Sequence, residues 1–167
     1  FVEELTKTVL ETGLLQEQDD HYVLNRPLPS MAIPTTLHAS LMARLDRLAP
    51  VREVAQIGAV VGREFSYELL STVAGLQKDR LEEALAQLVR SELIFCRGEI
   101  PQAVYSFKHA LVRDAAYSGL LKSRRATLHA TIADAFEQRF PEIVEAQPET
   151  LAHHLTEAGL FQKAEAY

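Results

Sequence analysis

The sequence feature that most constrains the fold is an apolar run enclosed by Pro50 and Gly62, two residue types that bound helices. Its apolar and small residues cover most of a helix circumference: Val51, Val54, Ile57, Gly58 and Val61. A helix that is apolar on nearly every side is stable only where other elements cover it. We therefore expect this helix to be the buried centre of a domain.

Two more helices and two short strands are predicted after this central helix. Apolar spacing predicts a short helix over 69–73 and a longer one over 79–91. β-favouring residues then fill 93–96 and 104–107 around a turn-like stretch. Three helices followed by a β-hairpin is the element order of a winged helix, which we predict for residues 35–108.

The stretch before residue 35 is predicted to contain a helix and a linker. Apolar spacing favours a helix over 1–15, and residues 22–24 favour a short strand. Pro27, Pro29 and Pro34 follow, and each removes a backbone donor and restrains the residue before it. Residues 1–34 should therefore end in a proline-rich linker. The winged-helix domain would open with a further helix whose leucines recur from Leu37 to Leu48.

From His109 onward the pattern is helical. One stripe of apolar residues is predicted after His109 and a second before Pro141, and a third helix should begin at Pro148 and end before Gly159. The inward residues of the first two stripes are Leu111, Val112, Ala115, Ala116 and Leu120, then Leu128, Ile132 and Phe136. The run 151–159 is similar to the first helix of a TPR-type repeat. The predicted fold class is mainly α, with a winged helix followed by helical, TPR-like hairpins over 109–167.

The charge pattern argues against nucleic-acid binding. The chain has 17 Lys and Arg against 23 Asp and Glu, a net charge of −6. In the predicted third helix of the winged helix, Arg80 and Arg90 are opposed by Asp79, Glu82 and Glu83. A surface that cancels its own charge releases few counterions on DNA. A DNA-binding winged helix of a transcriptional regulator therefore stays an alternative, and DNA is an unlikely partner.

No catalytic or metal-binding motif is present in the sequence. GxxxxGK[ST], GxSxG and HExxH are all missing. Cys96 lies in an apolar run and is expected to be a buried, inert thiol. His153 and His154 would project about 100° apart on a helix, so they cannot easily share an ion. His153 instead joins Glu149 and Glu157 on a face expected to be solvated.

Neither a membrane span nor a targeting signal is predicted. The densest apolar patch, 57–61, is far shorter than the ~18 residues that a span requires. A single cysteine suits a reducing compartment, and we expect a cytoplasmic protein. Because the chain opens Phe-Val-Glu-Glu-Leu, we expect it to be part of a longer protein.

His109 is the polar residue with the strongest claim to a function. It follows the second predicted wing strand and begins the next helix. An imidazole there can donate a hydrogen bond to an anion. A histidine that caps the helix or fills the core is the alternative that its position favours.

Three stretches resemble the bacterial STAND-class regulatory ATPases: Ile33 to Leu48, Val54 to Leu70 and Phe107 to Leu121. In that class, such a segment follows the P-loop ATPase domain and precedes a helical repeat array. Many members carry an adenylate or guanylate cyclase domain, and others are transcriptional activators. By this resemblance, residues 1–34 would include the end of the ATPase helical subdomain.

The resemblance also implies a role for His109. In related STAND proteins, a histidine in a Met-His-Asp motif after the wing reaches the β-phosphate of ADP. Lys108-His109-Ala110 stands at that place here, so Met and Asp are both replaced, and Asp114 lies one turn later. The resemblance implies ATP or ADP with Mg²⁺ as the cofactor of a full-length protein, and no cofactor or metal for this chain alone.

The sequence thus favours a non-catalytic regulatory and interaction segment of a multidomain STAND-type signalling protein, associated with a cyclase. Its partners would be the upstream P-loop ATPase domain, the downstream helical repeats and other proteins. Two alternatives stay open, the DNA-binding winged helix and a TPR-like adaptor that has no link to a nucleotide.

Overall fold

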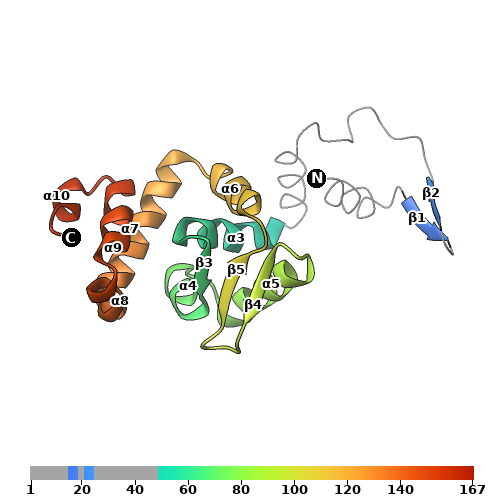
Figure 1. The fold of residues 1–167 in the computed structure, drawn as a ribbon, viewed down its shortest axis with the longest axis horizontal. Helices are drawn as coiled ribbons and strands as arrows, with labels where there is room; N and C mark the ends of the chain where they lie inside the picture. The colour runs from blue at the N-terminus through green and yellow to red at the C-terminus, as the bar shows by residue number, and fades with distance from the viewer. Residues whose placement is uncertain (1–14, 19–20, 25–48) are drawn as a thin grey trace. The chain divides into compact units, whose positions relative to one another are not determined.

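A computed structural model gives the structure of the chain and describes residues 15–18, 21–24 and 49–167. The described part is mainly helical and contains two small antiparallel sheets (Figure 1). Contacts divide the chain into two compact units, residues 1–48 and residues 49–167.

The first unit contributes one antiparallel strand pair, β1 (Leu15–Gln18) and β2 (His21–Leu24), in which Leu15 faces Leu24. The strand expected at 22–24 is confirmed. β1 has a polar sequence that gives no strand signal, and it includes Leu15, which the apolar spacing assigns to a helix. The other predictions for 1–34, and the helix ending at Leu48, lie outside the described residues.

The second unit begins with a group of helices and strands and continues with helices. The first group is α3 (Ala49–Val61), β3 (Glu64–Ser66), α4 (Tyr67–Val73), α5 (Lys78–Arg90), β4 (Ile94–Arg97) and β5 (Val104–Phe107). The helices that follow are α6 (Ala110–Ser118), α7 (Lys122–Arg139), α8 (Pro141–Ala146), α9 (Pro148–Glu157) and α10 (Phe161–Ala164).

The sheet of the second unit has the strand order β3-β5-β4, with every pair antiparallel. The two strands expected at 93–96 and 104–107 are confirmed as β4 and β5. The sequence does not predict β3, because its three residues are too few to show an alternation of apolar and polar side chains. It adds a third strand beside β5 and gives the order helix, strand, helix, helix, strand, strand.

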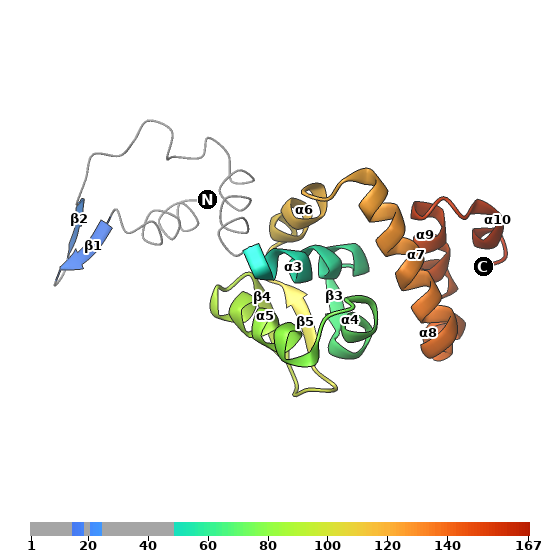
Figure 2. The same cartoon turned by 180° about the vertical axis from the view of Figure 1, so that it is seen from behind.

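α3 is the buried centre of this unit, as its sequence predicts. Val51, Val54 and Ile57 are each at most 1% exposed. α5, α6 and α7 pack around the helix, and both views show α3 between α6 and the pair formed by α4 and α5 (Figures 1 and 2). Removing such side chains from water is the main stabilising contribution to a core of this kind.

Gly58 allows α3 to approach the sheet closely. A Cβ atom at this position would lie 2.8 Å from the ring of Phe65, which is closer than carbon atoms can pack. The Phe65 ring is itself held by Tyr105, with centroids 5.8 Å apart, and by Phe107, at 5.6 Å. The absence of a side chain at Gly58 therefore determines how closely the helix sits on β3 and β5.

The C-terminal helices largely follow the predicted pattern. α7 ends before Pro141, α9 begins at Pro148, and Gly159 follows α9 with a φ of +79°. Leu111 is an exception, because 43% of it is exposed although its spacing assigns it to the buried stripe of α6. Val112, Ala115 and Ala116 already fill the face of α6 that meets α3, which leaves Leu111 on the outer side.

Candidate functional site

His109 lies at the junction of β5 and α6, where the sequence places it. It is the N-cap residue of α6, with extended backbone angles of φ −137° and ψ 143°. Its side chain is exposed and makes no capping hydrogen bond to the helix. Of the alternative of a capping or core histidine, the core position is therefore wrong. His109 does occupy the cap position of α6, where its backbone oxygen accepts a hydrogen bond from the Val112 N–H at 3.0 Å.

The neighbours of His109 carry charge on both sides. The Nζ atom of Lys108 lies 3.4 Å from Oε2 of Glu92 and 5.9 Å from the centre of the exposed Phe95 ring. Asp114, one turn further along α6, lies 3.2 Å from the guanidinium of Arg113. Asp114, the carboxylate nearest to the motif position that Ala110 occupies, is thus paired with the adjacent Arg113.

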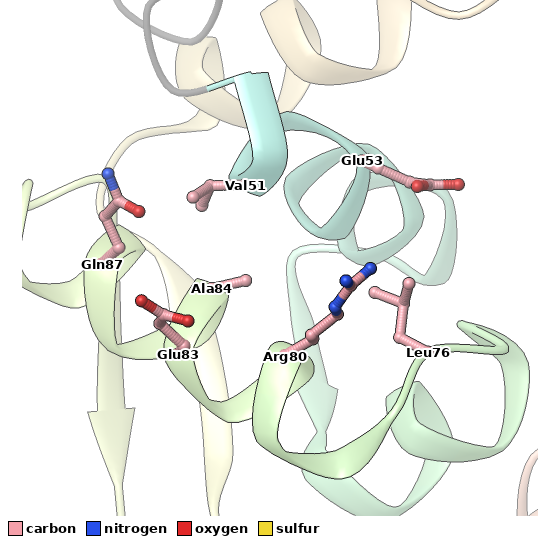
Figure 3. A pocket seen from close by; sticks show the side chains of 7 residues that line it. All are labelled: Val51, Glu53, Leu76, Arg80, Glu83, Ala84 and Gln87. Carbon is pink, nitrogen blue, oxygen red and sulfur yellow. The ribbon is translucent and has the colours of Figure 1, made fainter.

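A pocket of about 490 Å³ lies between α3 and α5 (Figure 3). Its lining combines three apolar and four polar side chains: Val51, Leu76 and Ala84, then Glu53, Arg80, Glu83 and Gln87. Figure 3 shows the Arg80 guanidinium beside Leu76, below the part of α3 that carries Glu53. One cation and two carboxylates give the lining a net charge of −1, which does not favour a phosphate.

Sequence reasoning does not find this pocket. Its residues come from two helices and a turn, and only the packing of α5 against α3 brings them together. The one available signal is Arg80, a cation on the face of α5 that bears Ala84 and Gln87 at helical spacing.

The charges of α5 partly cancel, as the sequence indicates. The Nζ atom of Lys78 lies 3.8 Å from Oε1 of Glu82, and the Tyr67 hydroxyl donates to the same oxygen at 3.0 Å. Asp79 lies in the first helical turn, where a carboxylate favours the helix dipole, and Arg90 in the last. The helix presents interspersed charges of both signs.

Cys96 is exposed, which corrects the expectation of a buried thiol. It lies on β4, an edge strand, where Ile94 is the residue covered by the helices. The apolar run therefore gives a strand without burying all of its residues. Over residues 15–18, 21–24 and 49–167, no group of three or more His, Cys, Asp or Glu is arranged to hold a metal ion.

A buried histidine pair, His129 and His154, is the polar feature that sequence reasoning misses. Each is 1% exposed, and their Nδ1 atoms lie 2.8 Å apart. Burial lowers the pKa of His129 to about 4 and that of His154 to about 3, so both imidazoles are neutral at pH 7. The available signal is spacing, since His154 follows the buried Leu151 by three residues and His129 precedes Ile132 by three.

The other side chains on α9 behave as predicted. Glu149, His153 and Glu157 are exposed and form the solvated face. Although exposed, His153 borders the buried pair, because its ring centre lies 5.7 Å from that of His129 and 5.5 Å from that of His154.

Comparison with known proteins gives one distant relative. No protein-family model matches the chain. It is 27% identical over 166 residues to an uncharacterized protein of Rhizobium meliloti (strain 1021). The similarity covers 98% of this chain, which spans 16% of the length of that protein. Among the described residues, no helix is long and apolar enough to cross a membrane.

Proposed function

We propose that this chain is a non-catalytic regulatory and interaction segment of a larger STAND-type ATP-binding signalling protein, associated with an adenylate or guanylate cyclase. It would couple the nucleotide state of an upstream P-loop domain to a downstream helical region in the cytoplasm. The relative that matches 98% of this chain is about six times longer, which supports a role within a larger protein.

The element order of residues 49–108 supports a winged helix as the central part of this segment. Helix α3, strand β3, helices α4 and α5, and strands β4 and β5 follow one another in the order of that fold. On this proposal, the loop between β4 and β5 is the wing, α6 and α7 form the linker, and α9 and α10 begin a TPR-like region. The proposed boundaries remain 1–34, 35–108 and 109–167.

The observation that carries the proposal is the exposed imidazole of His109 directly after the wing strand β5. There the side chain can reach a phosphate that an adjoining domain presents. A hydrogen bond to a charged group contributes about 1.5–3 kcal/mol, which shifts an equilibrium by roughly tenfold or more. ATP or ADP with Mg²⁺ would be bound by the P-loop domain, and His109 would report which of them is present.

The test is ADP release from the full-length protein that contains this segment. His109→Ala should raise the ADP dissociation rate about tenfold or more, because it removes a contact made only in the closed state. His153→Ala is the matched control, since it removes another exposed histidine at a distance along the chain, and it should leave the rate unchanged. An unchanged rate in His109→Ala would remove the proposed role.

A TPR-like adaptor without a nucleotide link is the second candidate, and one surface favours it. Leu160, Phe161 and Tyr167 at the C-terminal end are 39%, 62% and 46% exposed, and a shallow pocket of about 380 Å³ is lined by residues 159–163. An apolar surface of this kind suits a protein partner. Partner binding that Phe161→Asp abolishes, but that ADP and ATP leave equally strong, would favour the adaptor.

DNA binding is not part of the proposal. Residues 49–108 carry seven Lys and Arg against eight Asp and Glu, and Lys78 is within ion-pair distance of Glu82. If the purified chain lowered the electrophoretic mobility of duplex DNA in a salt-dependent way, DNA binding would have to be part of its function. Hydrolysis or cyclisation of ATP by the purified chain alone would argue against a non-catalytic segment.

A further inference from the structure

The C-terminal helices join the rest of the second unit mainly through one helix. α8 and α9 pack on α7, and α10 packs on α9, whereas α3 and α4 contact α7 from the other side. Both views show this arrangement, with α7 between α3–α4 and α8–α10 (Figures 1 and 2). Whatever holds α9 against α7 therefore holds the whole C-terminal group.

The contact between α7 and α9 has an apolar and a polar part. Ile132 and Phe136 of α7, and Leu151 and Leu155 of α9, are buried. The histidine pair lies among them, and the His154 ring packs 5.6 Å from that of Phe136 between ring centres. Solvent therefore does not compensate a charge placed on either imidazole.

A chain of hydrogen bonds continues from this pair to α6. The Tyr117 hydroxyl lies 3.3 Å from Nε2 of His129, and Nδ1 of His129 lies 2.8 Å from Nδ1 of His154. If Tyr117 donates to His129, then His129 donates to His154. If His154 donates instead, then His129 donates to Tyr117.

Both arrangements need an unprotonated nitrogen between the two histidines. When both imidazoles are doubly protonated, two N–H groups face each other at 2.8 Å and the hydrogen bond is lost. Two positive charges would also lie side by side in a buried contact. The neutral pair joins the helices, and the fully protonated pair separates them.

The surrounding charged groups also favour neutral imidazoles. His153 opposes protonation of both histidines, and Arg125, whose guanidinium packs on the Tyr117 ring, opposes protonation of His129. Glu157 of α9 favours the charged form of His129 but contributes less than burial does. On α8, Glu142 and Glu145 are exposed to solvent.

We propose that the hydrogen-bonded chain Tyr117–His129–His154 is an acid-released fastener, which holds α8–α10 on α7 while the pair is neutral and frees them on protonation. We expect the helices and strands of residues 49–118 to stay folded when this hydrogen-bonded chain breaks. The two histidines lie outside these residues, on α7 and α9, and only Tyr117 of the chain belongs to them. This inference does not depend on a nucleotide or on the role of His109.

The sign of the pH effect follows from the two imidazoles. Both have a lower pKa in the docked state, about 4 and about 3, than the usual 6.5 of a free histidine. Docking is therefore fully favoured above pH 6.5 and weakens as the pH falls toward 4, since the released state binds protons that the docked state does not. At pH 5, two freed histidines would favour release by up to about a thousandfold.

The experiment is hydrogen exchange of the 167-residue chain at pH 7, 6 and 5, with rates corrected for intrinsic exchange. We expect amides of α9 to be less protected than those of α3 at each pH, because α9 opens without global unfolding. Their protection should fall by up to about five hundredfold between pH 7 and pH 5, because the same pKa values cost docking less than about twofold at pH 7.

Two variants test whether the pair is the cause. His129→Leu combined with His154→Leu keeps the contact buried and apolar, and its α9 protection should change less than about threefold over the same pH range. His109→Gln is the control that removes an exposed histidine outside the contact between α7 and α9, and it should keep most of the wild-type fall.

Three outcomes would overturn the proposal. The first is α9 protection that does not change with pH in the wild-type chain. The second is equal protection of α9 and α3 at every pH, which would mean that α9 opens only by global unfolding. The third is a full pH effect in the double leucine variant, which would assign it to other groups.

Discussion

The two halves of the second unit, residues 49–108 and residues 109–167, bury their helices in different ways. In the first half, α3 is covered on several sides by apolar side chains, and the Phe65 ring, which packs against Tyr105 and Phe107, lies against Gly58 of this helix. In the second half, the contact between α7 and α9 encloses His129 and His154, which are the two buried polar side chains among the described residues. Apolar packing is nearly independent of pH, whereas a buried imidazole pair links packing to proton concentration.

Phe65→Ala should have the largest effect and should act on the first half alone. Phe65 is 3% exposed and packs between Gly58, Tyr105 and Phe107, so its removal leaves a cavity in the core. We expect the free energy of unfolding to fall by about 3–5 kcal/mol. Urea unfolding at pH 7 and pH 5 should give the same loss, and a loss that changes with pH would break the comparison.

His154→Ala should have an intermediate effect that depends on pH. At pH 7 the variant leaves a cavity and an unpaired Nδ1 on His129, with an expected cost of about 2–3 kcal/mol. At pH 5 the wild-type chain has itself lost part of the stability contributed by the two lowered pKa values, so the difference should narrow. Urea unfolding at the two pH values measures this, and a constant difference would show that the pair acts only by packing.

Arg124→Ala should have the smallest effect. Its guanidinium lies 3.2 Å from Oε1 of Glu53 and links α7 to α3, but both side chains are about half exposed. An exposed ion pair contributes on the order of 0.5 kcal/mol and is screened by salt. Thermal unfolding at low and high ionic strength should show a small loss of stability that disappears in salt. A loss above about 1.5 kcal/mol would show that an exposed ion pair contributes substantially to the contact between α3 and α7.

The elements with a clear period could be predicted from the sequence. The spacing of leucines in α5, the spacing of Leu128, Ile132 and Phe136 in α7, and the proline that begins α9 all correspond to observed helices, whereas the short helix α8 was not predicted. β4 and β5 follow from their β-branched and aromatic residues. Each of these signals is local, and each is repeated over several residues.

The features that could not be predicted depend on contacts between distant residues. β3 has three residues and is a strand because β5 pairs with it, and the pocket beside Arg80 exists because α5 packs on α3. The histidine pair joins positions 25 residues apart, and adjacent histidines in the sequence say nothing of a partner on another helix. Exposure of His109 and Cys96 likewise depends on which neighbours cover them.

The length of α7 has a consequence for how movement passes through the chain. Its 18 residues extend about 27 Å. α3 and α4 pack against one side of this helix, and α8 and α9 pack against the other. A rigid rod of that span behaves as a lever, so a tilt of a few degrees where α3 grips it displaces the far end by more than an ångström. The C-terminal helices would amplify a small rearrangement near α3 without any change in their own shape.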